Sequence, residues 1–201
     1  EENFNYTLSN SGTTRITKTP NNVSGVNVIS RNLTAGVPQA VTLTVEGLPS
    51  GVTASISRQN CRPDCSGNVT FTVSPTAPVG THRITVRGTP LGKTTSFNLV
   101  ITGRPFTVAC VASPNTILVG ETVTWRANVS GGVGPFDYSW SGDQIPTNPA
   151  PSDPSFNIIY STVGRKEATV AVIDRGSGNT QGSCDPVGTV QINFDTDIIE
   201  F

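Results

Sequence analysis

Short segments in which apolar and polar residues alternate recur along the whole chain. Val41, Leu43 and Val45 are separated by single polar residues, and this segment ends at the turn sequence Gly-Leu-Pro-Ser-Gly. A two-residue period places apolar side chains on one face of a β-strand. Comparable segments predict strands at residues 4–9, 41–46, 52–57, 69–74, 82–88 and 96–102, and then at 106–112, 119–129, 136–140, 156–160, 167–174 and 186–194.

This series of strands predicts an all-β chain built from two β-sandwich domains. No window of eleven or more residues shows the 3.6-residue period of an amphipathic helix. We expect seven or eight strands before Gly103 and about seven after it, which is the spacing of a sandwich. Gly103-Arg104-Pro105 is too short for a flexible linker. We therefore predict domains at residues 1–103 and 104–201.

Composition and charge exclude several classes of protein. Charged residues make up 13% of the 201 positions, the net charge is −1, and acidic and basic residues are interspersed. Without a basic stripe the chain has no footprint for nucleic acid. The longest apolar run, 97–101, is interrupted by Asn98 and is too short to span a membrane. The chain contains no methionine, so we expect a processed product from which a targeting segment was removed ahead of Glu1.

The four cysteines are divided evenly between the two halves. Four cysteines allow three pairings, and the division favours Cys61 with Cys65 and Cys110 with Cys184. Disulfides indicate an oxidising compartment. The alternative is a zinc site at Cys-Arg-Pro-Asp-Cys, which would need two more ligands in a chain whose only histidine is His82. We favour the disulfides and expect no metal or other cofactor.

Five Asn-x-Ser/Thr sequences are candidate N-glycosylation sites and agree with an exported chain. A chain rich in Asn, Ser and Thr also produces such sequences by chance. They are Asn5, Asn22, Asn32, Asn68 and Asn128.

Both ends of the chain carry large apolar residues. Two interpretations are open: these end segments fold onto the nearest domain of their own chain, or they pair with the sheet of a neighbouring subunit by strand addition. The candidate subunit-contact residues are Phe4, Tyr6, Leu8, Ile192, Phe194, Ile198, Ile199 and Phe201.

Several motifs resemble known extracellular families. Residues 41–57, 61–65 and 76–88 are similar to the Ig-like modules repeated in bacterial and archaeal secreted and surface proteins. Residues 120–127, 131–140 and 160–172 resemble a PKD-type Ig-like domain, which implies that Trp140 packs between sheets. That family continues with a Gly-Asp-Gly turn, whereas this chain has Ser141-Gly142-Asp143-Gln144. Such families supply spacers, stalks, adhesive repeats and fibre subunits.

The candidate catalytic groups form no recognisable constellation. His82 lies in an alternating segment that we expect to point outward, and no serine lies in a Gly-x-Ser-x-Gly sequence. We interpret the acids Asp137, Asp143, Asp153, Glu167, Asp174 and Asp185 as solvated loop charges. Asp143 and Asp153 could bind Ca²⁺ with backbone oxygens, and Phe136, Tyr138 and Tyr160 could stack on sugars.

The sequence thus predicts a non-catalytic subunit of an extracellular cell-surface filament or pilus-like fibre. Its partners would be copies of itself, joined by β-strand addition, together with a surface polysaccharide. The alternative is a spacer or glycan-binding accessory module of a larger secreted enzyme or adhesin. An enzyme is the least favoured reading.

Overall fold

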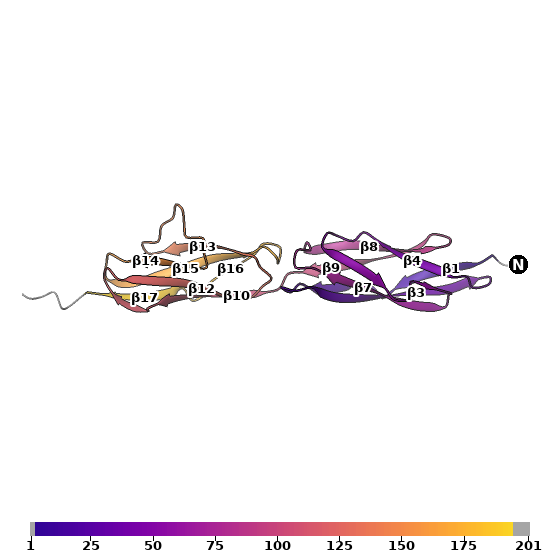
Figure 1. Ribbon diagram of the computed structural model, residues 1–201, viewed down its shortest axis with the longest axis horizontal. Coiled ribbons are helices and arrows are strands. Elements are labelled where there is room, and N and C mark those ends of the chain that lie inside the picture. Colours follow the sequence, from indigo (N-terminus) through magenta and orange to yellow (C-terminus); the bar gives the residue numbers. More distant parts are fainter. Residues whose placement is uncertain (1–2, 195–201) are drawn as a thin grey trace, which may run out of the picture. The chain divides into compact units, whose positions relative to one another are not determined.

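The computed structural model describes residues 3–194 and divides the chain into two compact units, unit 1 (Glu1–Arg104) and unit 2 (Pro105–Phe201). Every regular element of the described residues is a strand, and none is a helix (Figure 1). The all-β prediction is confirmed. The division follows Arg104, one residue later than the boundary expected from the sequence.

Unit 1 consists of two facing sheets. The first has the order β1-β3-β7-β5, and the second has the order β2-β9-β8-β4-β6. Their bounds are β1 Asn5–Asn10, β2 Thr14–Thr17, β3 Val23–Ala35, β4 Val41–Glu46, β5 Val52–Ile56, β6 Asn60–Cys61, β7 Cys65–Val73, β8 Gly80–Thr89 and β9 Lys93–Thr102. Alternate residues of these strands meet between the sheets, where Ile29, Phe71, Leu43, Ile84 and Leu99 are fully buried.

Unit 2 has the same two-layer construction. One sheet has the order β10-β12-β14, and the other has the order β11-β17-β15-β13 with β16 also paired to β15. Their bounds are β10 Phe106–Ser113, β11 Thr116–Leu118, β12 Thr122–Gly131, β13 Phe136–Gly142, β14 Ser155–Ile159, β15 Gly164–Asp174, β16 Thr180–Ser183 and β17 Gly188–Asn193. Two facing, mostly antiparallel sheets around one core make each unit an Ig-like β-sandwich.

Two tryptophans fill the core of unit 2. Trp125 and Trp140 are buried, and each indole N–H has a hydrogen-bond acceptor: the Tyr160 hydroxyl at 3.0 Å and the carbonyl of Asp153 at 2.9 Å. A buried indole needs such an acceptor because an unpaired N–H loses its bond to water. The Cys110–Cys184 disulfide joins β10 to the segment that follows β16.

In each unit the first strand is divided between the two sheets. In unit 1, β1 pairs antiparallel with β3, and β2 then pairs parallel with the last strand, β9. In unit 2, β10 pairs antiparallel with β12, and β11 pairs parallel with the last strand, β17. The start and the end of each unit are therefore joined by backbone hydrogen bonds.

The long strand β3 was not predicted because its hydrophobic pattern is inverted. Its inward positions include the polar residues Asn27 and Arg31, both buried, whereas Val26 and Val28 point outward. Asn27 is accommodated because its amide donates to the Thr14 hydroxyl at 3.0 Å. Counting β3 and the short strands β2 and β6, the described residues of unit 1 form nine strands rather than seven or eight, and those of unit 2 form eight rather than about seven.

The disulfides close loops of very different length, which predicts unequal effects of reduction. Cys110 and Cys184 are 74 residues apart, whereas Cys61 and Cys65 are four apart. In the chain-entropy model, loss of the long bridge lowers the free energy of unfolding by about 4 kcal/mol and loss of the short bridge by about 2 kcal/mol. Both tryptophans lie in unit 2, so tryptophan fluorescence during denaturant unfolding follows that unit. Replacing Cys110 and Cys184 by Ser should shift this transition, and replacing Cys61 and Cys65 should leave it in place.

Candidate functional site

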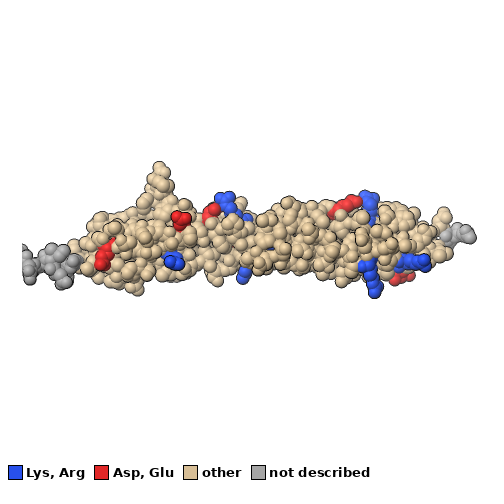
Figure 2. All heavy atoms as spheres, viewed as in Figure 1, with Lys and Arg blue, Asp and Glu red and all other residues tan. Residues whose placement is uncertain are grey.

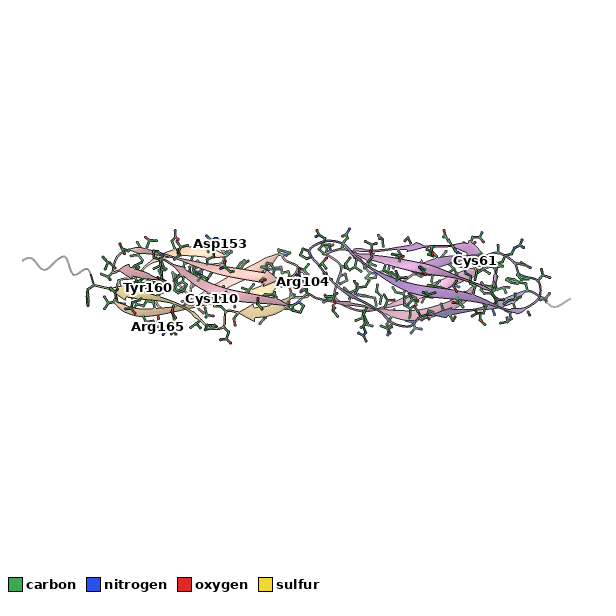
Figure 3. The ribbon with its side chains drawn as sticks, turned by 90° about the horizontal axis from the view of Figure 1, so that it is seen from below. Cys61, Arg104, Cys110, Asp153, Tyr160 and Arg165 are labelled. Carbon is green, nitrogen blue, oxygen red and sulfur yellow. A yellow bond between two sulfur atoms is a disulfide. The ribbon has the colours of Figure 1, made fainter. Side chains whose placement is uncertain are left out.

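Residues 58–65 form a largely exposed segment of unit 1 that is fixed by a disulfide and by hydrogen bonds. The disulfide between Cys61 and Cys65 closes its second half, with Cα atoms 6.6 Å apart. Figure 3 shows Cys61 at the end of unit 1 opposite to Arg104. The side chains of Arg58 and Arg62 in this segment are exposed.

The buried guanidinium of Arg31 holds the same segment from inside. One of its terminal nitrogens donates to the Val41 carbonyl at 2.9 Å, and the other donates to the Arg58 carbonyl at 2.7 Å. Burial lowers the pKa of Arg31, and the charge interaction with Tyr6 raises it. A guanidinium keeps its proton in proteins, so the group stays charged. Arg31 therefore acts as a charged brace between β3, β4 and the exposed segment.

A third contact fixes the segment near its end. The Asp64 carboxylate accepts a hydrogen bond from the backbone N–H of Leu33 in β3 at 2.7 Å. The disulfide thus closes the segment 58–65 on itself, and Arg31 and the Asp64 carboxylate attach it to β3, while the side chains of Arg58 and Arg62 are exposed. Chemically, this arrangement presents two cations on a fixed backbone.

In unit 2 a buried carboxylate organises the turn at residues 131–135. Asp174 is fully buried, and its oxygens accept hydrogen bonds from the backbone N–H groups of Val133 at 2.8 Å, Gly134 at 2.9 Å and Ser177 at 3.2 Å. Burial alone raises the pKa of Asp174, but the hydrogen bonds from Ser177, Val133 and Gly134 together hold it below its ordinary value. The expectation that Asp174 is a solvated loop charge is wrong, because three donors replace its water.

Glycine is required within this turn. Gly132 has φ +70°, and a Cβ there would lie 2.7 Å from a carboxylate oxygen of Asp174. A larger residue would displace the carboxylate from its donors. The sequence interpretation of 131–134 as a turn between two strands is thus explained by a specific partner, Asp174.

The other acids of unit 2 have ordinary structural surroundings. The carboxylate of Asp143 accepts from the backbone N–H of Glu167 at 2.8 Å, and Asp137 pairs with Arg175. Glu167 lies 3.4 Å from the guanidinium of Arg165, and both side chains are exposed. Among residues 3–194, no three His, Cys, Asp or Glu side chains come together to hold a metal ion.

Two surface hollows of unit 2 adjoin one another at Val187. The first is lined by Ser141, Gly142, Asp143, Glu167, Ala168, Thr169 and Val187. The second lies between β10 and the segment before β17, and it is lined by Ala109, Cys110, Val111, Ala112, Asn115, Asp185, Pro186, Val187, Gly188 and Thr189. Together they form a partly apolar, acid-bearing surface, which we call the acidic hollow.

His82 does not lie as expected. Its position along β8 has the parity of the buried residues Ile84 and Val86, and the side chain is half-buried rather than directed outward. Its Nε2 lies 3.3 Å from the Pro78 carbonyl. The imidazole is thus part of the turn that precedes β8.

Most of the predicted subunit-contact residues of the described part lie in the chain's own cores. Tyr6 and Ile192 are buried, and Phe4 and Leu8 pack against the core of unit 1. The expectation that Tyr6 and Ile192 fill a neighbour's groove is therefore wrong, because β1 and β17 already pair within their own units. Phe194 is 70% exposed. Ile198, Ile199 and Phe201 lie outside the described residues.

All five candidate glycosylation sites are exposed. Asn5, Asn32 and Asn68 lie on the outer face of the sheet β1-β3-β7-β5, Asn22 immediately precedes β3, and Asn128 lies on β12. Glycans at these positions would not disturb either core. Phe136 and Tyr138 are partly buried against the core of unit 2 and Tyr160 is fully buried, so Tyr160 is not a surface stacking residue.

No protein-family model and no curated protein matches the chain. Solved structures do: the titin domains Z1Z2 in complex with telethonin are 12% identical, with a TM-score of 0.43, and the match covers 96% of this chain and 100% of that one. Domains 4–9 of the surface layer protein SbsC are 15% identical, with a TM-score of 0.36 and coverage of 96% and 32%. The full ectodomain of mouse nectin-like molecule 4 is 13% identical, with a TM-score of 0.37 and coverage of 98% and 66%.

The chain spans only part of several of these structures, including 65% of a three-domain titin fragment and a third of the surface-layer fragment. At this level of similarity we draw no functional conclusion from them. Within the part of the chain that the structure describes, no helix is long and apolar enough to cross a membrane.

The depressed pKa of Asp174 predicts how the stability of unit 2 depends on pH. A carboxyl whose pKa is lower in the folded state stabilises the fold above its unfolded pKa of about 4, and this contribution is lost as the pH falls through the folded pKa. Asp174→Asn should lower the free energy of unfolding at pH 7 by about 2–3 kcal/mol, because one carboxylate oxygen becomes an NH2 group that cannot accept from the backbone N–H facing it. Tryptophan fluorescence in denaturant should show the gap between the two proteins narrowing below about pH 4.

The exposed carboxyl of Asp185 supplies the control. Asp185→Asn should leave both the stability at pH 7 and its pH dependence nearly unchanged. A constant gap between wild type and Asp174→Asn from pH 7 to pH 2 would contradict the role assigned to this carboxylate.

Proposed function

We propose that this chain is a non-catalytic structural subunit of an extracellular cell-surface filament or pilus-like fibre, with copies of itself and a surface polysaccharide as partners. The observation that carries the proposal is the parallel pairing of the first and last strands in both units, β2 with β9 and β11 with β17. We keep the bacterial or archaeal Ig-like character of unit 1 and the PKD-type character of unit 2 as parts of the same proposal.

The physical reason is the direction in which tension acts on these pairs. The chain enters each unit at its first strand and leaves it at its last strand, and the two run parallel. Tension between them pulls the two strands along their axes in opposite directions. The hydrogen bonds of the pair then carry the force together, in shear, instead of opening one at a time. Val119 N–H to the Asn193 carbonyl, 2.9 Å, and Gln191 N–H to the Asn115 carbonyl, 3.0 Å, are bonds of this kind in unit 2.

The cysteines and the buried charged residues Arg31 and Asp174 support the same proposal, because they stabilise the fold. The four cysteines form two disulfides. Arg31 and Asp174 are buried and hold backbone segments in place. Two disulfides favour an extracellular location, because such bonds persist in oxidising compartments. Five exposed glycosylation sequences agree with export.

Substitution of Val119 tests the mechanical role. Val119→Pro removes the N–H that donates to the Asn193 carbonyl, whereas Val119→Ala keeps this N–H and loses the two γ-methyl groups. When single molecules are pulled from their ends, we expect two unfolding events. Val119→Pro should markedly lower the force of one of them, and Val119→Ala should lower it much less. Equal forces for the two variants would show that this backbone pairing does not resist tension.

Assembly through the C-terminal segment gives a second test. Deleting residues 195–201 should abolish fibre formation, seen by negative-stain microscopy, while the thermal unfolding midpoint stays unchanged because β17 ends at Asn193. A trimmed chain that still polymerises would rule out strand addition by this segment. Trimming residues 1–8 is not an equivalent test, since it removes Tyr6 from the core of unit 1.

A further inference from the structure

The charged residues are divided unevenly between the two units. Residues 1–104 contain nine Lys and Arg against four Asp and Glu, whereas residues 105–201 contain four against ten. Unit 1 therefore carries a net charge of +5 and unit 2 a net charge of −6, although the whole chain is close to neutral. The sequence impression of interspersed charge is wrong at the level of the domains. Opposite charges on two units favour association between copies of one chain.

Two of the positive charges of unit 1 lie on the segment 58–65. Arg58 and Arg62 are exposed on the segment 58–65, whose backbone is held by the disulfide, Arg31 and Asp64. Figure 2 shows Lys and Arg atoms gathered toward this end of unit 1. A rigid segment loses little conformational entropy when it binds. We call residues 58–65 the arginine tip.

Part of the negative charge of unit 2 lies on the acidic hollow, whose charge is opposite to that of the arginine tip. The acidic hollow contains the carboxylates of Asp143, Glu167 and Asp185, and none of its lining residues is Lys or Arg. Between the acids lie apolar side chains, and Val187 and Val111 are exposed there. A guanidinium suits such a surface because its planar fork binds carboxylates and its weakly hydrated faces pack on apolar groups.

The position of the tip within unit 1 points to a second copy as the partner. Figure 3 shows Cys61 and Arg104 at opposite ends of unit 1, and the chain continues into unit 2 from Arg104. We propose that the arginine tip of one copy docks on the acidic hollow of unit 2 of a second copy. This contact is head to tail, and a contact of this kind repeats from copy to copy. The proposal deepens the proposed fibre and rests on it.

Sedimentation of the full chain tests the contact. Self-association should be strong at about 10 mM salt, where the screening length is about 30 Å, and weak at about 1 M, where it is about 3 Å. The double substitution Arg58→Glu and Arg62→Glu should raise the dissociation constant at low salt by at least about tenfold, because each copy loses its docking cations. Circular dichroism and the thermal unfolding midpoint verify that the variant folds.

A control with the same change in net charge separates the tip from bulk electrostatics. Arg15 and Arg83 are exposed on β2 and β8, on the outer face of the sheet β2-β9-β8-β4-β6 and outside the arginine tip. Arg15→Glu with Arg83→Glu should change the dissociation constant by less than about threefold. If this control weakens association as much as the tip variant does, the inferred contact is wrong.

Charge reversal on the other side completes the test. Glu167→Lys with Asp185→Lys reverses two acids of the hollow, and neither side chain has a role in the core. This variant alone should fail to associate, and an equimolar mixture with the tip variant should associate, because the native tip of one variant meets the native hollow of the other. If the mixture stays monomeric, the pairing is wrong.

Two further outcomes also overturn the inference. One is a wild-type chain that stays monomeric at every salt concentration. The other is unchanged self-association of the tip variant together with lost binding to dextran sulfate, which would assign the tip to an anionic polymer instead. The unfolding force of Val119→Pro is measured on single molecules, so the mechanical role of the terminal strands is tested independently of this contact.

Discussion

The pairing of the first strand with the last closes each sandwich, and the remaining structure depends on it. The chain begins each unit in one sheet and crosses to the other after a few residues, so that β2 meets β9 and β11 meets β17. This crossing covers the edges of both last strands and draws the two sheets together over the core. Because the chain enters and leaves through the same pair of strands, any tension on the unit passes through their backbone hydrogen bonds.

Each unit buries a charged group that holds a loop, Arg31 in unit 1 and Asp174 in unit 2. Arg31 donates to backbone carbonyls beneath the segment 58–65, and Asp174 accepts from backbone N–H groups of the turn 131–135. Neither group faces an opposite charge among its hydrogen-bond partners. Backbone carbonyl and N–H groups compensate the charge instead, so each charged group holds the backbone segments that supply them. Arg31 and Asp174 therefore fix the conformation of two surface segments.

The two units differ in net charge, and this difference bears on how copies of the chain associate in the contact that we propose. A neutral total conceals a basic unit 1 and an acidic unit 2. The segment 58–65 of unit 1 carries two exposed arginines, and the acidic hollow of unit 2 carries three carboxylates. In the fibre that we propose, the parallel terminal strands would resist shear and the complementary surfaces would join copies, and separate residues would serve these two roles.

The two-residue alternation of apolar side chains was sufficient to predict the all-β class, the two domains and most of the strands, because burial on one face of a sheet requires that period. The division of four cysteines between the halves predicted both disulfides for a similar reason, since each bridge joins residues of one unit. These are local properties, and local sequence contains them.

Other features depend on contacts that only the folded chain creates. In β3 the polar residues Asn27 and Arg31 point inward and Val26 points outward, since their partners come from residues far away in the sequence. Tyr6 and Ile192 proved to be core residues because β1 and β17 have partners within their own units. Likewise, Asp143, Glu167 and Asp185 became one surface only when β13, β15 and the segment before β17 were brought side by side. The sequence alone determined which residues alternate, and the tertiary structure decided which of them meet.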